Sequence, residues 1–237
     1  MESVYEQQAL REALRYEKSL QRRASIIKRS TKKIQTKVNQ KIPNRIHTIV
    51  TESIKKMIEL ALTTSSYIRV IDVNQAWRLE ERESVIRERI KQYKQTAMLE
   101  GAGTGAGGLW LGAADFPLLL SIKMKLLFDI GQIYGYNVKD YQERMYLLHV
   151  FMLAFSSEEK QREVMQILNN WEKEQRLWKE VDWKTLQLEY RDTIDFVKML
   201  QLIPGFGAVV GAIVNRQLLD QLGEAAMNMY RLRLLKK

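Results

Sequence analysis

The chain has 237 residues, of which 46% are hydrophobic and 28% are charged, and this composition is typical of a globular protein that buries a full core. The absence of cysteine excludes disulfide bonds, thiolate metal sites and cysteine nucleophiles. The net charge of +10 at pH 7 is concentrated in residues 18–45, which contain ten basic residues and no acidic one. This concentration favours an anionic partner for one segment rather than for the whole surface.

The first 18 residues, MESVYEQQALREALRYEK, are charged and lack the apolar stretch of a secretory signal. No uninterrupted run of 18 apolar residues occurs, so an ordinary membrane-spanning helix is not expected. We therefore expect a cytoplasmic protein.

Helical periodicity dominates the chain and predicts an all-α fold, a single multi-helix domain of roughly eight helices. Residues 1–43 are expected to form a basic N-terminal amphipathic helical arm, and residues 44–237 the all-helical domain. Capping-box spacing at Asp140 with Glu143, and at Ser156 with Glu159, predicts helix starts near 141 and 157. The other expected helices cover about 46–60, 75–97, 118–134, 182–201 and 206–235. The run YIRVIDV at 67–73 is the one strand-like stretch.

The basic arm has an apolar stripe along its length, formed at steps of seven and four by Leu20, Ile27, Ile34, Val38 and Ile42. A basic amphipathic helix of this kind suits an anionic membrane surface, because the stripe enters the headgroup region while the cations contact lipid phosphates. The candidate lipid- or anion-binding residues are Arg22, Arg23, Lys28, Arg29, Lys32, Lys33 and Lys37. Nucleic acid is a less suitable partner, because residues 22–45 contain no aromatic side chain on which a base could stack. The remaining alternative is a helix packed on the body with its basic face in water.

Two glycine-rich segments, EGAGTGAGGLWLGAADFPLL at 100–119 and LIPGFGAVVGAIVN at 202–215, share GxxxG spacing among apolar residues. Glycine costs a helix about 1 kcal/mol relative to alanine, so we expect a compensating close approach between helices or with lipid. The GxGxxG match within the first segment does not indicate a nucleotide site, because no strand pattern precedes it. The residues of the candidate pocket or packing seam are Gly103, Gly105, Gly108, Trp110, Asp115, Gly207, Gly211 and Asn215.

Catalytic signatures are missing from the sequence, which has no Walker-type loop, no GxSxG and no HExxH. His47 and His149 are each alone in an apolar helical pattern, and we expect them to be packed or surface residues rather than metal ligands or acid–base groups. Asp115, before Phe116 and Pro117, suits a helix N-cap, and the alternative is a carboxylate in a pocket. Asp129 is expected to pair with Lys123, Lys125 or a base elsewhere. No metal site or cofactor is expected.

Three blocks of the sequence resemble the EcsC family of bacterial proteins: GAGTGAGGLWLGAADFPLLL, IGQIYGYNVKDYQERMYLLHVFMLA and IPGFGAVVGAIVN. The resemblance implies an accessory role at the inner face of the cell membrane, because the family's namesake is encoded beside the ATP-binding and membrane subunits of an ABC transporter. It carries over no catalytic residue. The matching positions are Gly103, Gly105, Gly108, Asp115, Gly135, Arg144, Pro204, Gly211 and Asn215.

These observations together favour a non-catalytic, membrane-peripheral helical protein on the inner face of the cell membrane. It is expected to dock on anionic lipid through the basic arm and to assist a membrane complex such as an ABC transporter. The alternative is a lipid- or small-molecule-binding protein, or a hydrolase, with a pocket at the glycine-rich segments and Asp115.

Overall fold

The structure is a computed structural model, and it describes residues 3–26, 44–63, 69–105, 116–156, 158–174 and 207–236. These ranges contain eight helices and no strand, which confirms the all-α prediction. The helices are α1 (Val4–Ile26), α3 (Asn44–Thr63), α4 (Leu79–Gly105), α6 (Phe116–Ile133), α7 (Tyr141–Phe155), α8 (Glu158–Asn169), α9 (Trp171–Glu174) and α11 (Gly207–Leu235). Residues 69–73 of the strand-like run are irregular, and the helix expected over 182–201 lies outside the described residues.

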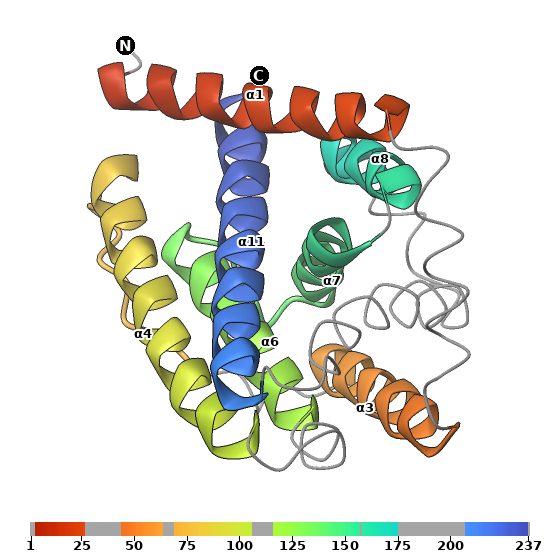
Figure 1. Ribbon diagram of the computed structural model, residues 1–237. Helices are drawn as coiled ribbons and strands as arrows, with labels where there is room; N and C mark the ends of the chain where they lie inside the picture. The colour runs from red at the N-terminus through yellow and green to blue at the C-terminus, as the bar shows by residue number, and fades with distance from the viewer. Residues whose placement is uncertain are drawn as a thin grey trace.

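Helix α11 lies at the centre of the molecule, between α4 on one side and α7 on the other (Figure 1). It runs antiparallel to α4, since Asp220 pairs with Lys94 and Arg231 pairs with Glu83. The Ile90 side chain of α4 packs onto α11 at Gly223, where a Cβ atom would lie only 2.5 Å from Cδ1 of Ile90. Glycine at this position therefore lets α4 and α11 pack along their length.

Helix α7 is the most deeply buried element, and every residue from Glu143 to Phe155 is buried. From Met145 to Phe155 its side chains are apolar or aromatic on all sides, with His149 as the exception, as expected for a helix that is surrounded by other helices. His149 contacts the Met145 carbonyl oxygen through Nδ1 at 2.8 Å, and its ring centroid lies 5.3 Å from that of Trp171. Burial lowers the pKa of His149 to about 4, so the ring is neutral at pH 7. His149 is thus a packed histidine, as the sequence predicted.

The sequence predicted a capping box at the start of α7, and this detail is wrong. The helix begins at Tyr141, close to the expected position, but Asp140 makes no side-chain capping bond. Its carboxylate instead accepts a hydrogen bond from the Asn137 side chain at 2.8 Å. Gly135, in the preceding turn, has φ of +95°, a left-handed conformation that favours glycine. The local spacing therefore predicted the start of α7 but not the bonds made there.

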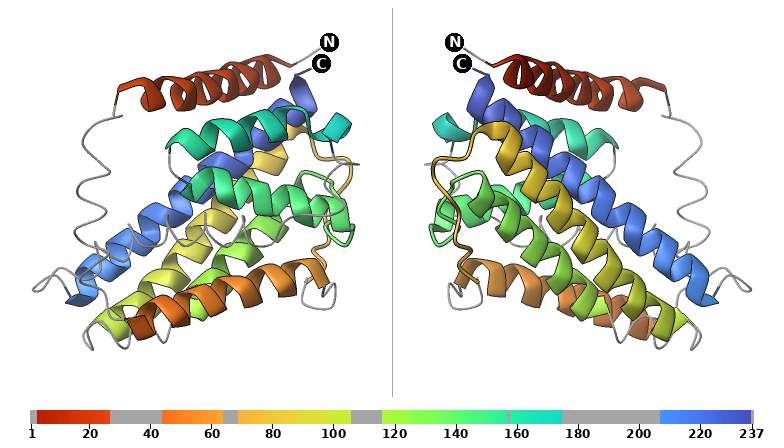
Figure 2. Two further views of the ribbon diagram at one scale, coloured as in Figure 1. Left: turned by 90° about the vertical axis from the view of Figure 1, so that its right-hand side faces the viewer. Right: turned by 90° about the vertical axis from the view of Figure 1, so that its left-hand side faces the viewer.

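Helix α1 crosses the C-terminal end of α11 and also contacts α8 and α4, so it covers one end of the bundle (Figures 1 and 2). Its inner face is buried at Ala9, Ala13 and Leu20. Leu20, the first residue of the predicted apolar stripe, therefore packs in the core. The other four stripe residues lie in 27–43, outside the described residues, and the proposed domain boundary at residue 43 stays a prediction.

Candidate functional site

The densest cluster of buried charge in the described part of the chain surrounds the last two turns of α11. Helical geometry turns consecutive residues by about 100°, so neighbouring side chains there point to different helices. Arg231 reaches α4 and α1, where it contacts Glu83 and Glu12, while Tyr230 and Arg233 reach Glu143 on α7. Charged and hydroxyl groups thus bond the end of α11 to three other helices, α1, α4 and α7.

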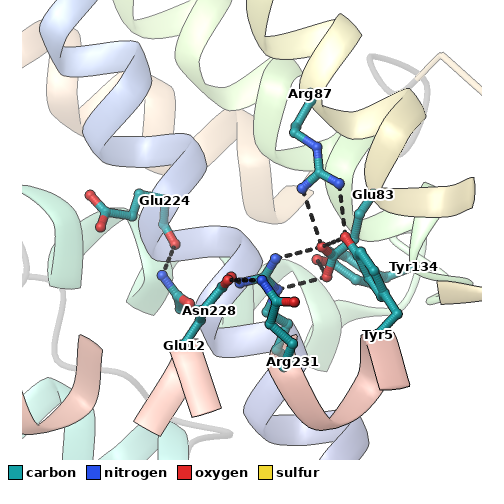
Figure 3. A network of polar contacts seen from close by, with 9 residues as sticks. Tyr5, Glu12, Glu83, Arg87, Tyr134, Glu224, Asn228 and Arg231 are labelled. Carbon is teal, nitrogen blue, oxygen red and sulfur yellow. Dashed lines mark hydrogen bonds and ion pairs between the residues drawn. The ribbon is translucent and has the colours of Figure 1, made fainter. Parts of the chain in front are cut away.

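We call the first group the Glu83 network, which consists of Tyr5, Glu12, Glu83, Arg87, Tyr134 and Arg231 (Figure 3). The Glu83 side chain is completely buried. Its two carboxylate oxygens accept hydrogen bonds from Nε and Nη2 of Arg231, at 2.7 and 2.5 Å. This bidentate geometry is the strongest arrangement of an arginine and a carboxylate.

Two tyrosines from distant elements complete the coordination of Glu83. The hydroxyl of Tyr5 on α1 donates to Oε2 at 2.6 Å, and the hydroxyl of Tyr134, after α6, donates to Oε1 at 3.0 Å. Arg231 also donates from Nη1 to Glu12 on α1 at 2.9 Å. Because these groups come from four elements, the network fixes α1 and α6 against the α4–α11 pair.

We call the second group the Glu143 network, which consists of Tyr136, Glu143, Tyr146, Glu172, Tyr230 and Arg233. Glu143 accepts hydrogen bonds from the Tyr230 hydroxyl at 2.5 Å and from Arg233 Nη1 at 2.7 Å. The Arg233 guanidinium lies over the rings of Tyr136 and Tyr146, 4.1 and 4.5 Å from their centroids, a cation–π arrangement. Arg233 Nε also donates to Glu172 in α9, at 2.8 Å. The two networks touch where the rings of Tyr134 and Tyr230 stack, with centroids 4.9 Å apart.

In Glu143 and Arg231, burial disfavours the charged form of the side chain, whereas the hydrogen-bonded partners favour it, so the two effects shift the pKa in opposite directions. Burial raises the pKa of Glu143, even though Arg233 and Tyr230 favour its ionised form. Burial alone would lower the pKa of Arg231, but its bonds to Glu83 more than offset this and the pKa is raised. The pKa of Tyr134 is well above its usual value because the hydroxyl is buried and faces the Glu83 carboxylate. Tyr134 is therefore a hydrogen-bond donor throughout the physiological pH range.

The chemistry of this arrangement fits a structural role. A catalytic acid or base must reach a substrate proton, whereas both oxygens of Glu83 are occupied by arginine and tyrosine donors and have no exposed surface. In the part of the chain that the structure describes, no cluster of three or more His, Cys, Asp or Glu side chains could hold a metal ion. The two networks therefore hold helices together.

Comparison with known proteins places the chain in a family. The family model for the EcsC protein family matches residues 7–235. The chain belongs to the EcsC family. It is 49% identical over 228 residues to "Protein EcsC" of Bacillus subtilis (strain 168), covering 96% of this chain and 95% of that protein. It is also 34% identical over 148 residues to "Uncharacterized protein YdbA" of the same organism, covering 60% of this chain and 54% of that protein. No solved structure matches the chain.

Membership of the EcsC family confirms the resemblance seen in the three sequence blocks. Two of the positions that carry this resemblance have clear structural roles. Gly135 adopts the left-handed conformation described above, with the Arg82 guanidinium beside it, and Arg82 donates from Nη1 to the Ile133 carbonyl oxygen at 2.9 Å. Arg144 donates from Nη1 to the Lys139 carbonyl oxygen, which holds the turn before α7. Both positions therefore shape the segment between α6 and α7.

The predicted lipid-binding residues of this EcsC-family chain are only partly described. Arg22 is exposed on α1, and Arg23 lies in the same helix. The other five, Lys28, Arg29, Lys32, Lys33 and Lys37, lie outside the described residues. None of the described helices is long and apolar enough to cross a membrane.

The glycine-rich segments are also described in part. Gly103 and Gly105 lie in the last turn of α4, and the first turns of α11 contain Gly207, Gly211 and Asn215. These two helix ends lie side by side at the end of the molecule opposite α1 (Figures 1 and 2). Gly108, Trp110 and Asp115 lie outside the described residues, so the seam, the alternative pocket and the Asp115 cap stay predictions.

Sequence reasoning missed the carboxylates that organise the fold. Glu83 had a usable signal, because it lies three residues before the buried Ile86 and therefore on the same helix face. Glu143 was interpreted as half of a capping box, whereas its partners are 87 and 90 residues away along the chain. Asp129 accepts a hydrogen bond from the Tyr93 hydroxyl at 3.0 Å, a partner that the sequence did not suggest.

Proposed function

We propose that this EcsC-family chain is a non-catalytic peripheral membrane protein that docks on anionic lipid through residues 18–45 and assists a membrane complex such as an ABC transporter. One observation carries the proposal: residues 18–45 hold ten basic residues and no acidic one, a charge equal to that of the whole chain. A polybasic segment on an amphipathic pattern is the usual sequence feature for binding the anionic inner leaflet.

The described beginning of this segment supports the proposal. Lys18 and Arg22 are exposed on the face of α1 that points away from the body. Each basic residue near an anionic surface contributes on the order of 1 kcal/mol, so five of the ten would hold the protein at the membrane with about 5 kcal/mol. That attraction depends on salt, because it falls off within a Debye length of about 8 Å at physiological ionic strength.

The resemblance to the family supports the accessory role. The resemblance described above implies a function beside an ABC transporter, and the structure's buried carboxylates are engaged in holding helices rather than exposed for chemistry. A peripheral protein that contacts a membrane complex needs a rigid body and a docking segment. Co-purification with the ATP-binding and membrane subunits of an ABC transporter after detergent extraction tests this role, and recovery of the chain without either subunit would contradict it.

Vesicle co-sedimentation tests the docking. We expect binding to vesicles that contain phosphatidylglycerol and none to phosphatidylcholine vesicles. A variant in which Lys28, Arg29, Lys32, Lys33 and Lys37 are replaced by glutamine should bind at least about tenfold more weakly. The matched control removes five exposed cations elsewhere, at Lys55, Lys56, Arg78, Lys91 and Lys139, and should bind like the wild type. Binding that is independent of anionic lipid, or equal in the two variants, would refute the docking.

A further inference from the structure

The outer face of α1 carries a stripe of basic side chains that begins before the basic segment 18–45. Arg11, Arg15, Lys18 and Arg22 follow one another at steps of four, three and four residues, which places all four on one side of a helix. All four are exposed. Within the part of the chain that the structure describes, none of them makes an ion pair or a side-chain hydrogen bond. The stripe therefore presents four unpaired cations over about three helical turns.

The acidic residues of α1 are separated from this stripe. Glu12 accepts a hydrogen bond from Arg231 at 2.9 Å, and Glu17 accepts one from Lys236 at 3.2 Å. Glu17 also accepts from the Asn169 side chain at 2.6 Å. These acids are turned toward the body, where cations near the C-terminus of α11 neutralise them. Two of the three acidic side chains of α1, Glu12 and Glu17, are thus bound toward the body, whereas Glu6 accepts a hydrogen bond from the Ser3 backbone N–H at the start of the helix. The four cations of the stripe are exposed on the opposite side.

The same outer face exposes two apolar side chains. Val4 is 81% exposed and Leu14 is 40% exposed, and Leu14 lies between Arg11 and Lys18 along the stripe. Arginine and lysine can extend to headgroup phosphates while their methylene stems and a leucine remain at the interface.

We propose that the outer face of α1, with Arg11, Arg15, Lys18 and Arg22, is a membrane-docking surface that lies parallel to an anionic bilayer. This inference rests on the function proposed above and extends the docking site to residues N-terminal of the basic segment 18–45. It also sets an orientation. Helix α1 faces the bilayer, while α3 and the glycine-rich ends of α4 and α11 point away from it (Figure 2).

A charge-removal experiment tests the surface. The variant Arg11→Gln with Arg15→Gln removes two exposed cations from outside the basic segment 18–45, and we expect its partition onto phosphatidylglycerol vesicles to fall about tenfold or more. The matched control, Lys55→Gln with Lys56→Gln on α3, should change partition less than twofold. If both variants bind like the wild type while the five-residue arm variant does not, the proposed function stands and this inference is overturned. If the wild type does not bind the vesicles, both are overturned.

A fluorescence experiment tests the orientation. The chain has no cysteine, so a single introduced cysteine can carry an environment-sensitive dye without background labelling. Dye at Leu14→Cys on α1 should shift to the blue on anionic vesicles, whereas dye at Leu118→Cys, 48% exposed in the native chain at the start of α6, should not. A shift at Leu118 without one at Leu14 would place the glycine-rich end in the lipid and overturn the inference. Loss of duplex DNA binding, without loss of vesicle binding, in the Arg11 and Arg15 variant would also overturn it.

Discussion

Replacement of Glu83 by glutamine is the most direct test of the Glu83 network. Glutamine keeps the size and one acceptor oxygen of the side chain but removes its charge. Arg231, whose side chain is only 8% exposed, would then retain Glu12 as its anionic partner, and the Glu12 side chain is 43% exposed. One of the two bidentate bonds to Arg231 would also face an amide N–H₂ group instead of an oxygen.

The expected loss of stability is large for a single substitution. Breaking one side of a buried ion pair typically costs about 3–5 kcal/mol, and the retained acceptor oxygen places Glu83→Gln near 3 kcal/mol. For a chain of this size each 1 kcal/mol lowers Tm by about 2–4 °C, so Tm should fall by roughly 6–12 °C. In the double variant with Arg231→Met the losses should not add, and the coupling should be about 2 kcal/mol, because each single change leaves the other partner buried.

Urea unfolding followed by far-UV circular dichroism measures this change, and an unchanged m-value would show that the unfolding transition is comparable. The matched control is Glu81→Gln, two residues away on α4. Glu81 pairs with Arg78 where both side chains are at least half exposed, so its loss should stay within about 0.5 kcal/mol. If Glu83→Gln destabilises no more than Glu81→Gln, the claim that the network fixes the helix bundle is wrong.

Two further predictions concern the core. Lowering the pH from 7 to 4 should lower the free energy of unfolding by up to roughly 3 kcal/mol through His149. The pKa of His149 is about 4 in the folded state and 6.5 in the unfolded chain, so the unfolded state binds the proton first as the pH falls. In urea melts, the variant His149→Asn should lose this part of the pH dependence. Gly223→Ala should lower the stability of the fold by about 1 kcal/mol, because the overpacking against Ile90 exceeds the gain in helix propensity. Adding Ile90→Val should recover part of the loss. A Gly223→Ala variant that is more stable than the wild type would contradict the close contact between Gly223 and Ile90.

The helices could be predicted where apolar spacing is regular and side chains are large. The pattern that includes Ile54 and Met57 predicted α3, and both residues are buried. Helix α1 gave a weaker signal, because the fully buried residues of its inner face before Leu20 are Ala9 and Ala13, and small residues add little to a hydrophobic pattern. The sequence therefore predicts a docking arm at least as well as a helix packed on the body.

The networks could not be predicted because their partners are far apart in the sequence. Glu83 and Arg231 are separated by 148 residues, and Glu143 and Arg233 by 90. Local patterns report which face of a helix is apolar, and a charged residue on such a face looks like an interruption until its partner is known. Glu143 shows the same limit, since its local spacing suggested a cap and its actual bonds are tertiary.

The inward pairing of the α1 acids bears on how the helix would meet a membrane. An anionic bilayer repels carboxylates as strongly as it attracts cations at the same distance, so four acids on the outer face would cancel the stripe. Glu12 and Glu17 instead lie on the side toward the body and are paired with Arg231 and Lys236. A helix is about 10–12 Å in diameter, so Glu12 and Glu17 lie further from the bilayer than the four cations do. The difference in distance is close to the Debye length of about 8 Å at physiological ionic strength, so salt screens the repulsion of these two carboxylates. Pairing and screening therefore act together, and contacts that hold α1 on the bundle also leave its outer face uniformly positive.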